Sequence, residues 1–288
     1  MATRGVITEA QLMAAMPRSA NPNLGFRGNP DGEQGPDLVD YGVYAQPLHN
    51  ALARFGYRSD IISYGNNGKI ISYLRRGWPV VTWVTWHLIP HTPRLAESNG
   101  VQFFLVPGEH AITAVGFGDN RLIANDPSDG TRVRYPWQQF DRAWGYFGNM
   151  ALAVDPCPLP GDVQSLSLTT ISATSATITW SAAPHATRYH VTVIRHISHD
   201  KLVFQGDVTG EQLVIANPHP GATYQISVQA TNDCGDVSSV ARLAVQIPKL
   251  VPTPTPSPTP VETSIPLPSA TATATATQTS SPSPSATS

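Results

Sequence analysis

Residues 108–127, GEHAITAVGFGDNRLIANDP, decide the fold of the first half of this chain. Two apolar runs, residues 111–117 and 121–124, flank a Gly-Asp-Asn turn, a pattern typical of two adjacent antiparallel strands. His110 stands at the start of the first run, and Asp126 follows the end of the second. Adjacent antiparallel strands bring such a start and such an end together. The sequence therefore predicts a histidine and a carboxylate side by side at one sheet edge.

A histidine–carboxylate pair is the base half of a nucleophilic hydrolase. Imidazole titrates near neutrality, so it can take a proton from a nucleophile and return it to a leaving amine. The carboxylate selects the imidazole tautomer and stabilises the imidazolium. The alternative is a histidine and a turn aspartate that are satisfied by backbone groups. The chain's only two cysteines, Cys157 and Cys234, both follow the pair, so no thiol precedes it.

The surrounding segments predict an α+β domain, because helices come first and a mostly antiparallel sheet follows. Thr8 and Gln11 have capping-box spacing at the start of a short helix. Periodicity predicts further helices over residues 44–55, 67–76 and 137–144. Apolar runs predict strands over residues 79–86, 103–106, 111–117, 121–124, 132–135 and 151–154.

The first domain, residues 1–155, resembles the C39-like family of papain-fold cysteine peptidases. The resemblance spans roughly residues 3 to 154. It rests on five segments, residues 41–48 (YGVYAQPL), 77–81 (GWPVV), 108–116, 125–127 and 148–151. It implies a papain-like α+β fold, with His110 as general base and Asp126 as its orienter. It also implies a peptide or protein substrate and no cofactor.

One departure from the family lies at the front of the chain. Family members begin with a helix that carries the catalytic cysteine, and a glutamine that helps to form the oxyanion site precedes it. The match starts near Thr3, in the segment that follows this helix. We therefore expect an incomplete peptidase domain that is inactive as given. The alternatives are a non-catalytic extracellular binding or adhesion protein that uses the same cleft, and a hydrolase with another nucleophile.

No other residue pattern offers a replacement site. Ser63, Ser72 and Ser98 lack the motif of a strained nucleophile elbow. His87 and His91 have the spacing of a helical zinc pair, but a proline between them interrupts any helix, so we expect no metal site.

Residues 162–248 predict an all-β immunoglobulin-like sandwich, because apolar residues alternate along residues 175–180, 189–193 and 224–230. Trp180, Tyr189 and residues 221–232 resemble a fibronectin type III domain, with Tyr224 as its tyrosine corner. The resemblance implies a spacer or adhesive module that could contact a cell-surface polymer or protein.

A proline-rich connector, residues 156–161, separates the two domains. In a type III sandwich the chain enters at the end that carries the last inter-strand loop, so the resemblance implies a Cys157–Cys234 disulfide. Two unpaired thiols are the open alternative, because connectivity is not readable from sequence.

The tail and the overall composition indicate which partners and which location the protein has. Residues 249–288 are almost wholly Pro, Thr, Ser and Ala, which predicts disorder. The formal net charge is −2 without a basic cluster, so we expect no nucleic-acid partner. No apolar run is long enough for a transmembrane segment, and no signal-peptide pattern opens the chain. We expect a monomer that is extracellular or on the cell surface in its full-length form.

Overall fold

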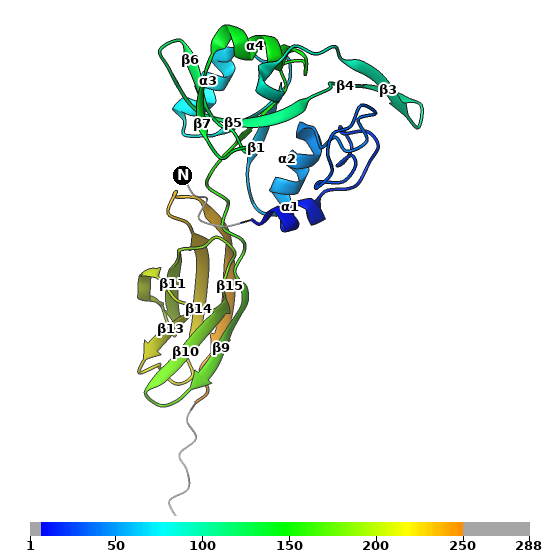
Figure 1. The fold of residues 1–288 in the computed structure, drawn as a ribbon. Coiled ribbons are helices and arrows are strands. Elements are labelled where there is room, and N and C mark those ends of the chain that lie inside the picture. Colours follow the sequence, from blue (N-terminus) through cyan, green and yellow to red (C-terminus); the bar gives the residue numbers. More distant parts are fainter. Residues whose placement is uncertain (1–6, 250–288) are drawn as a thin grey trace, which may run out of the picture. The chain divides into compact units, whose positions relative to one another are not determined.

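The computed structural model describes residues 7–249 of the 288-residue chain. The predicted disordered tail is residues 249–288, of which residues 250–288 lie outside the described residues. No helix among those residues is long and apolar enough to cross a membrane. Helices and strands alternate in the first part of the chain, and strands alone follow (Figure 1).

Among the described residues, the first part contains four α-helices, one short 3-10 turn and eight strands. In chain order they are α1 (Glu9–Ala15), α2 (Ala45–Arg54), β1 (Ser59–Ile62), α3 (Asn67–Arg75), β2 (Val80–Thr85), η1 (Trp86–Leu88), β3 (Arg94–Ser98), β4 (Val101–Leu105), β5 (Glu109–Gly118), β6 (Arg121–Asn125), β7 (Arg132–Pro136), α4 (Trp137–Gly145) and β8 (Ala151–Val154).

Six of these strands form one antiparallel sheet in the order β1-β8-β2-β5-β6-β7. Alternation along β2 and β5 sends side chains to two cores. On one face, Val84 and Ile112 pack in a cluster with residues of α3 and α4. On the other face, Trp83 packs with Tyr41 and Tyr44. The sheet is therefore covered by side chains on both faces of its central strands.

Local sequence signals explain where the helices begin. Thr8 and Gln11 form the predicted capping box of α1. The Asn66 side chain accepts a hydrogen bond from the Lys69 backbone N–H and caps α3. On α3, Ile70 and Tyr73 are buried, whereas Ile71 and Leu74 are half-buried.

Two strands of the first part were not predicted. β1 is only four residues long and includes Asp60, so its alternation is too brief to be distinctive. β3 pairs with β4 as a separate two-stranded ribbon. The sequence of β3 resembles that of a polar loop, because it contains the exposed residues Arg94 and Glu97.

The second part is a two-sheet β-sandwich. Its strands are β9 (Gln164–Ile171), β10 (Ser175–Ser181), β11 (Arg188–His196), β12 (Asp200–Val208), β13 (Gln212–Ala216), β14 (Thr223–Thr231) and β15 (Val237–Gln246). They form sheets in the orders β13-β10-β9 and β12-β11-β14-β15. The predicted inward faces are confirmed, since Ile178, Trp180 and Val191 all lie in the core. The Tyr224 hydroxyl accepts a hydrogen bond from the His219 backbone N–H at 3.0 Å, as a tyrosine corner requires.

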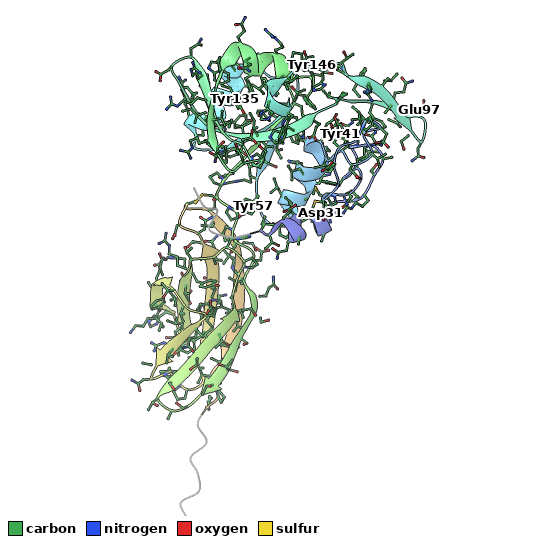
Figure 2. The ribbon with its side chains drawn as sticks, viewed as in Figure 1. Asp31, Tyr41, Tyr57, Glu97, Tyr135 and Tyr146 are labelled. Atoms are coloured by element: carbon green, nitrogen blue, oxygen red, sulfur yellow. A yellow bond between two sulfur atoms is a disulfide. The ribbon has the colours of Figure 1, made fainter. Side chains whose placement is uncertain are left out.

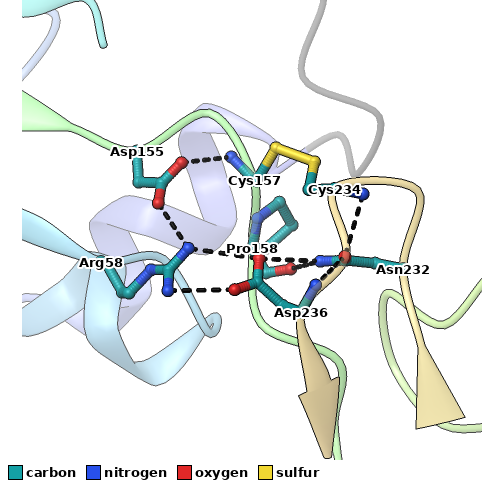
Figure 3. The surroundings of a disulfide bond; sticks show 7 residues. All are labelled: Arg58, Asp155, Cys157, Pro158, Asn232, Cys234 and Asp236. Carbon is teal, nitrogen blue, oxygen red and sulfur yellow. Dashed lines mark hydrogen bonds and ion pairs between the residues drawn. A yellow bond between two sulfur atoms is a disulfide. The ribbon is translucent and has the colours of Figure 1, made fainter. Parts of the chain in front are cut away.

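The connector is tied down by covalent and polar contacts (Figure 3). Cys157 and Cys234 form a disulfide with a Cα–Cα distance of 6.3 Å. The Arg58 guanidinium reaches Asp155 at 2.6 Å and Asp236 at 3.1 Å. Both cysteines are therefore paired with each other in this structure.

Candidate functional site

His110 and Asp126 meet at the end of the central sheet. His110 is the second residue of β5 and lies opposite Val84 of β2. Asp126 directly follows β6, whose last residue, Asn125, pairs with Thr113 of β5. This register brings His110 Nε2 to 2.8 Å from Asp126 Oδ1. Both side chains are largely buried, with exposed fractions of 13% and 11%.

Asp126 is held in its ionised form. Burial opposes ionisation, but hydrogen bonds from the Ser128 hydroxyl, the Ser128 backbone N–H and His110 outweigh it, so the pKa of Asp126 lies below its ordinary value. Tyr135, on β7 (Figure 2), donates a hydrogen bond to the second carboxylate oxygen at 3.4 Å. The burial of Tyr135 and the Asp126 charge raise the pKa of the Tyr135 phenol. An ionised Asp126 makes Nε2 the protonated nitrogen of His110.

The second ring nitrogen of His110 is therefore the basic one. No side chain or backbone group within residues 7–249 makes a hydrogen bond to Nδ1. A neutral imidazole with Nε2–H bound to a carboxylate presents a lone pair at Nδ1. The arrangement can take up a proton from any donor placed within hydrogen-bond reach of this atom.

No thiol is available to this base in the described part of the chain. Both cysteines of the sequence are consumed by the Cys157–Cys234 disulfide. The Ser72 hydroxyl donates to the Lys69 carbonyl at 2.7 Å. No serine hydroxyl of residues 7–249 forms a hydrogen bond with His110.

The sequence of the first domain matches a family model described as "Peptidase_C39 like family" over residues 3–152, which is more than half of the chain. The chain belongs to the Peptidase_C39 like family. A fibronectin type III model matches residues 161–244. Both predicted resemblances are thus confirmed.

Two Bacillus proteins are similar to the C39-like domain. The "Uncharacterized protein YvpB" of Bacillus subtilis (strain 168) is 29% identical over 140 residues, which cover 46% of this chain and 52% of that protein. The chain thus spans about half the length of this curated relative. A crystal structure described as a putative C39-like peptidase from Bacillus anthracis is 20% identical, with 53% of this chain and 82% of that chain covered and a TM-score of 0.47.

The type III domain has solved counterparts of its own. The fn3 domain of human collagen alpha-1(XX) chain is 18% identical, with 34% of this chain and 93% of that chain covered and a TM-score of 0.30.

An unpredicted carboxylate, Glu109, lies on the opposite face of the C39-like domain's sheet. It sits across from Thr85 in the β2–β5 register. Its carboxylate packs against Gly42, where an added side-chain carbon would lie 3.2 Å from Oε2; the positive φ of Gly42, 122°, also favours glycine there. Burial raises the pKa of Glu109 to about 8. The Glu109 charge in turn contributes to the raised pKa of Tyr41, whose position Figure 2 marks. Glu109 is therefore largely protonated at neutral pH.

An open cavity of about 490 Å³ adjoins the pair. Its lining residues are Thr113, Asn125, Asp126, Pro127, Gly130 and Arg132. Asp126 lines this cavity, whereas His110 does not.

Sequence reasoning missed three residues that contact the pair. Ser128 and Tyr135 bind the carboxylate, and the Trp86 ring lies beside the imidazole. The order Asp-Pro-Ser in residues 126–128 is a turn signal that could have revealed Ser128. The other two contacts depend on strand register and a turn conformation that no short motif encodes.

Proposed function

We propose that the C39-like domain carries the base half of a cysteine-peptidase-type site with papain-like α+β architecture, and that residues 1–288 alone do not cleave peptides. The observation that carries this proposal is the 2.8 Å hydrogen bond between His110 and Asp126 in a chain whose two cysteines form a disulfide. The base and its orienter are present, whereas no thiol accompanies them.

The proposed chemistry assigns one task to each group. His110 Nδ1 takes the proton of a thiol, and the thiolate attacks the carbonyl carbon of a peptide. The imidazolium then returns the proton to the leaving amine nitrogen. Asp126 keeps Nε2–H in place and stabilises the imidazolium between the two transfers. The substrate is a peptide or protein whose scissile carbonyl is held beside this thiol and His110.

A direct test starts from the coding sequence immediately upstream of the Met1 codon. If it encodes a cysteine in frame, the extended chain should hydrolyse a fluorogenic peptide, and both cysteine-to-alanine and His110→Ala variants should lose this activity. An extended chain that keeps its activity without His110 contradicts the proposal. An in-frame stop codon directly before Met1 favours a second function instead.

That second function is binding without catalysis, at the cell surface or outside the cell. The type III match supports it, as does the pairing of both cysteines in a disulfide. We expect the fluorescently labelled full chain, as a monomer, to bind intact cells of its source organism, with a surface polymer or protein as its partner. Binding no stronger than that of a labelled control protein would contradict this role.

A further inference from the structure

We propose that Trp86 is a positioning residue for His110, because it packs against the imidazole and shields the His110–Asp126 hydrogen bond from water. This inference rests on the proposed function, which gives His110 its task. The ring centroids of Trp86 and His110 are 4.9 Å apart, with an interplanar angle of 69°. Such an edge-to-face contact is a favoured aromatic geometry.

The sheet register explains why the two rings meet. Val84 lies directly opposite His110 in the β2–β5 pair. Trp86 follows Val84 by two residues, so alternation places it on the same face, diagonal to His110. The Trp86 backbone N–H donates to the Gly108 carbonyl at 2.7 Å, which extends the strand pairing by one step. The indole is therefore anchored at the start of β5.

The turn after Trp86 is held in a costly conformation. His87 and Leu88 both have positive φ, 51° and 58°, although neither is glycine. Consecutive residues in this region persist only where the surroundings over-determine them. Leu88 supplies that anchor, since its side chain is buried in the same core cluster as Val84 and Ile112. The turn thus ends β2 abruptly and keeps Trp86 at the sheet end instead of letting it continue along the strand.

The exposure of the rings fits a shield. Trp86 is 43% exposed, whereas the His110 side chain it touches is only 13% exposed. A large apolar side chain that stays partly in water gains less from burial than a core residue does. Its position covers the imidazole, and removing it would open that side of the ring to solvent. Water would then compete for Nε2–H and for the carboxylate.

The test measures how fast the His110 Nε2 proton exchanges with water, by NMR on the full chain. We expect a protected Nε2–H resonance in the unchanged protein and its loss in Asp126→Asn. Trp86→Ala should speed the exchange about tenfold or more, while Trp86→Phe, which keeps an aromatic ring, should change it by less than about threefold. Ile89→Ala is the matched control, since Ile89 is 51% exposed and lies three residues further along the same turn.

The outcomes separate this inference from the proposed function. If Asp126→Asn removes the protection but Trp86→Ala leaves the rate within twofold of the unchanged protein, Trp86 does not position the pair. An unprotected Nε2–H in the unchanged protein overturns both. Equal acceleration by Ile89→Ala points to general loosening of the turn and also overturns the proposal. If Trp86→Ala does not fold, Trp86→Leu takes its place with the same expected acceleration, because leucine cannot cover the ring.

Discussion

Replacing Glu109 with glutamine should remove a pH-dependent loss of stability from the C39-like domain. Burial raises the pKa of Glu109 from its ordinary value of 4.5 to about 8. Between these two pH values the unfolded chain is ionised at this residue while the folded chain holds the proton. The folded state binds more protons there, so its stability falls as pH rises through this window and then levels off above about pH 8.

The size of the effect follows from the same values. A pKa difference of one between the folded and unfolded chains changes the unfolding free energy by about 1.36 kcal/mol. The rise in the pKa of Glu109 from 4.5 to about 8 therefore corresponds to at most about 5 kcal/mol. Glu109 is only half-buried by its accessible surface, and water near the carboxylate reduces the effect. The quantity to compare is the unfolding free energy of Glu109→Gln minus that of the unchanged protein. We expect this difference to be about 1–3 kcal/mol larger at pH 8 than at pH 5.

Urea unfolding at pH 5, 6.5 and 8, followed by tryptophan fluorescence, measures this difference. Five of the six tryptophans lie before residue 155, so the signal reports mainly on the C39-like domain. Glu97→Gln is the matched control, because Glu97 lies exposed on β3 (Figure 2) and should leave the pH profile unchanged. Parallel pH profiles for Glu109→Gln and the unchanged protein would refute the reasoning.

Two further predictions concern the second part of the chain. The Cys157–Cys234 bond closes a 77-residue separation, so a Cys→Ser double variant should lose up to about 4.5 kcal/mol of unfolding free energy, measured by urea titration; no loss would show that the bond does not constrain the unfolded chain. Tyr189→Phe should cost about 1–3 kcal/mol because it leaves the buried Ala183 N–H unpaired. Tyr224→Phe should cost less, since the donor to Tyr224 belongs to an exposed residue; the reverse order would contradict this argument.

Period and capping rules predicted most of the regular elements from local sequence. The apolar runs of β2, β5 and β6 are long enough to be recognised. The capping box of α1 needs only two residues at fixed spacing. By contrast, β1 is short and β3 is mostly polar on its exposed face, so both depend on partners that are distant in sequence. These strands form because they pair with distant strands of a sheet, so local propensity does not predict them.

Local sequence likewise predicts some residues of the candidate site and not others. His110 and Asp126 are visible in sequence because they bracket one hairpin. Trp86 reaches His110 through a turn with positive φ at non-glycine residues, which no composition rule predicts. Glu109 looks like the ordinary first residue of a strand, and its packing against Gly42, which is distant in sequence, is not readable from local sequence.

The measurement that tests the central claim most directly is peptide hydrolysis by residues 1–288. The purified chain and its His110→Ala variant would be incubated with an unstructured protein substrate, and new amino termini would be counted by mass spectrometry. We predict no cleavage above the uncatalysed background for either chain, because the His110–Asp126 pair has no thiol to activate. Cleavage by the unchanged chain that disappears in His110→Ala would contradict the account, since it would require a nucleophile other than cysteine.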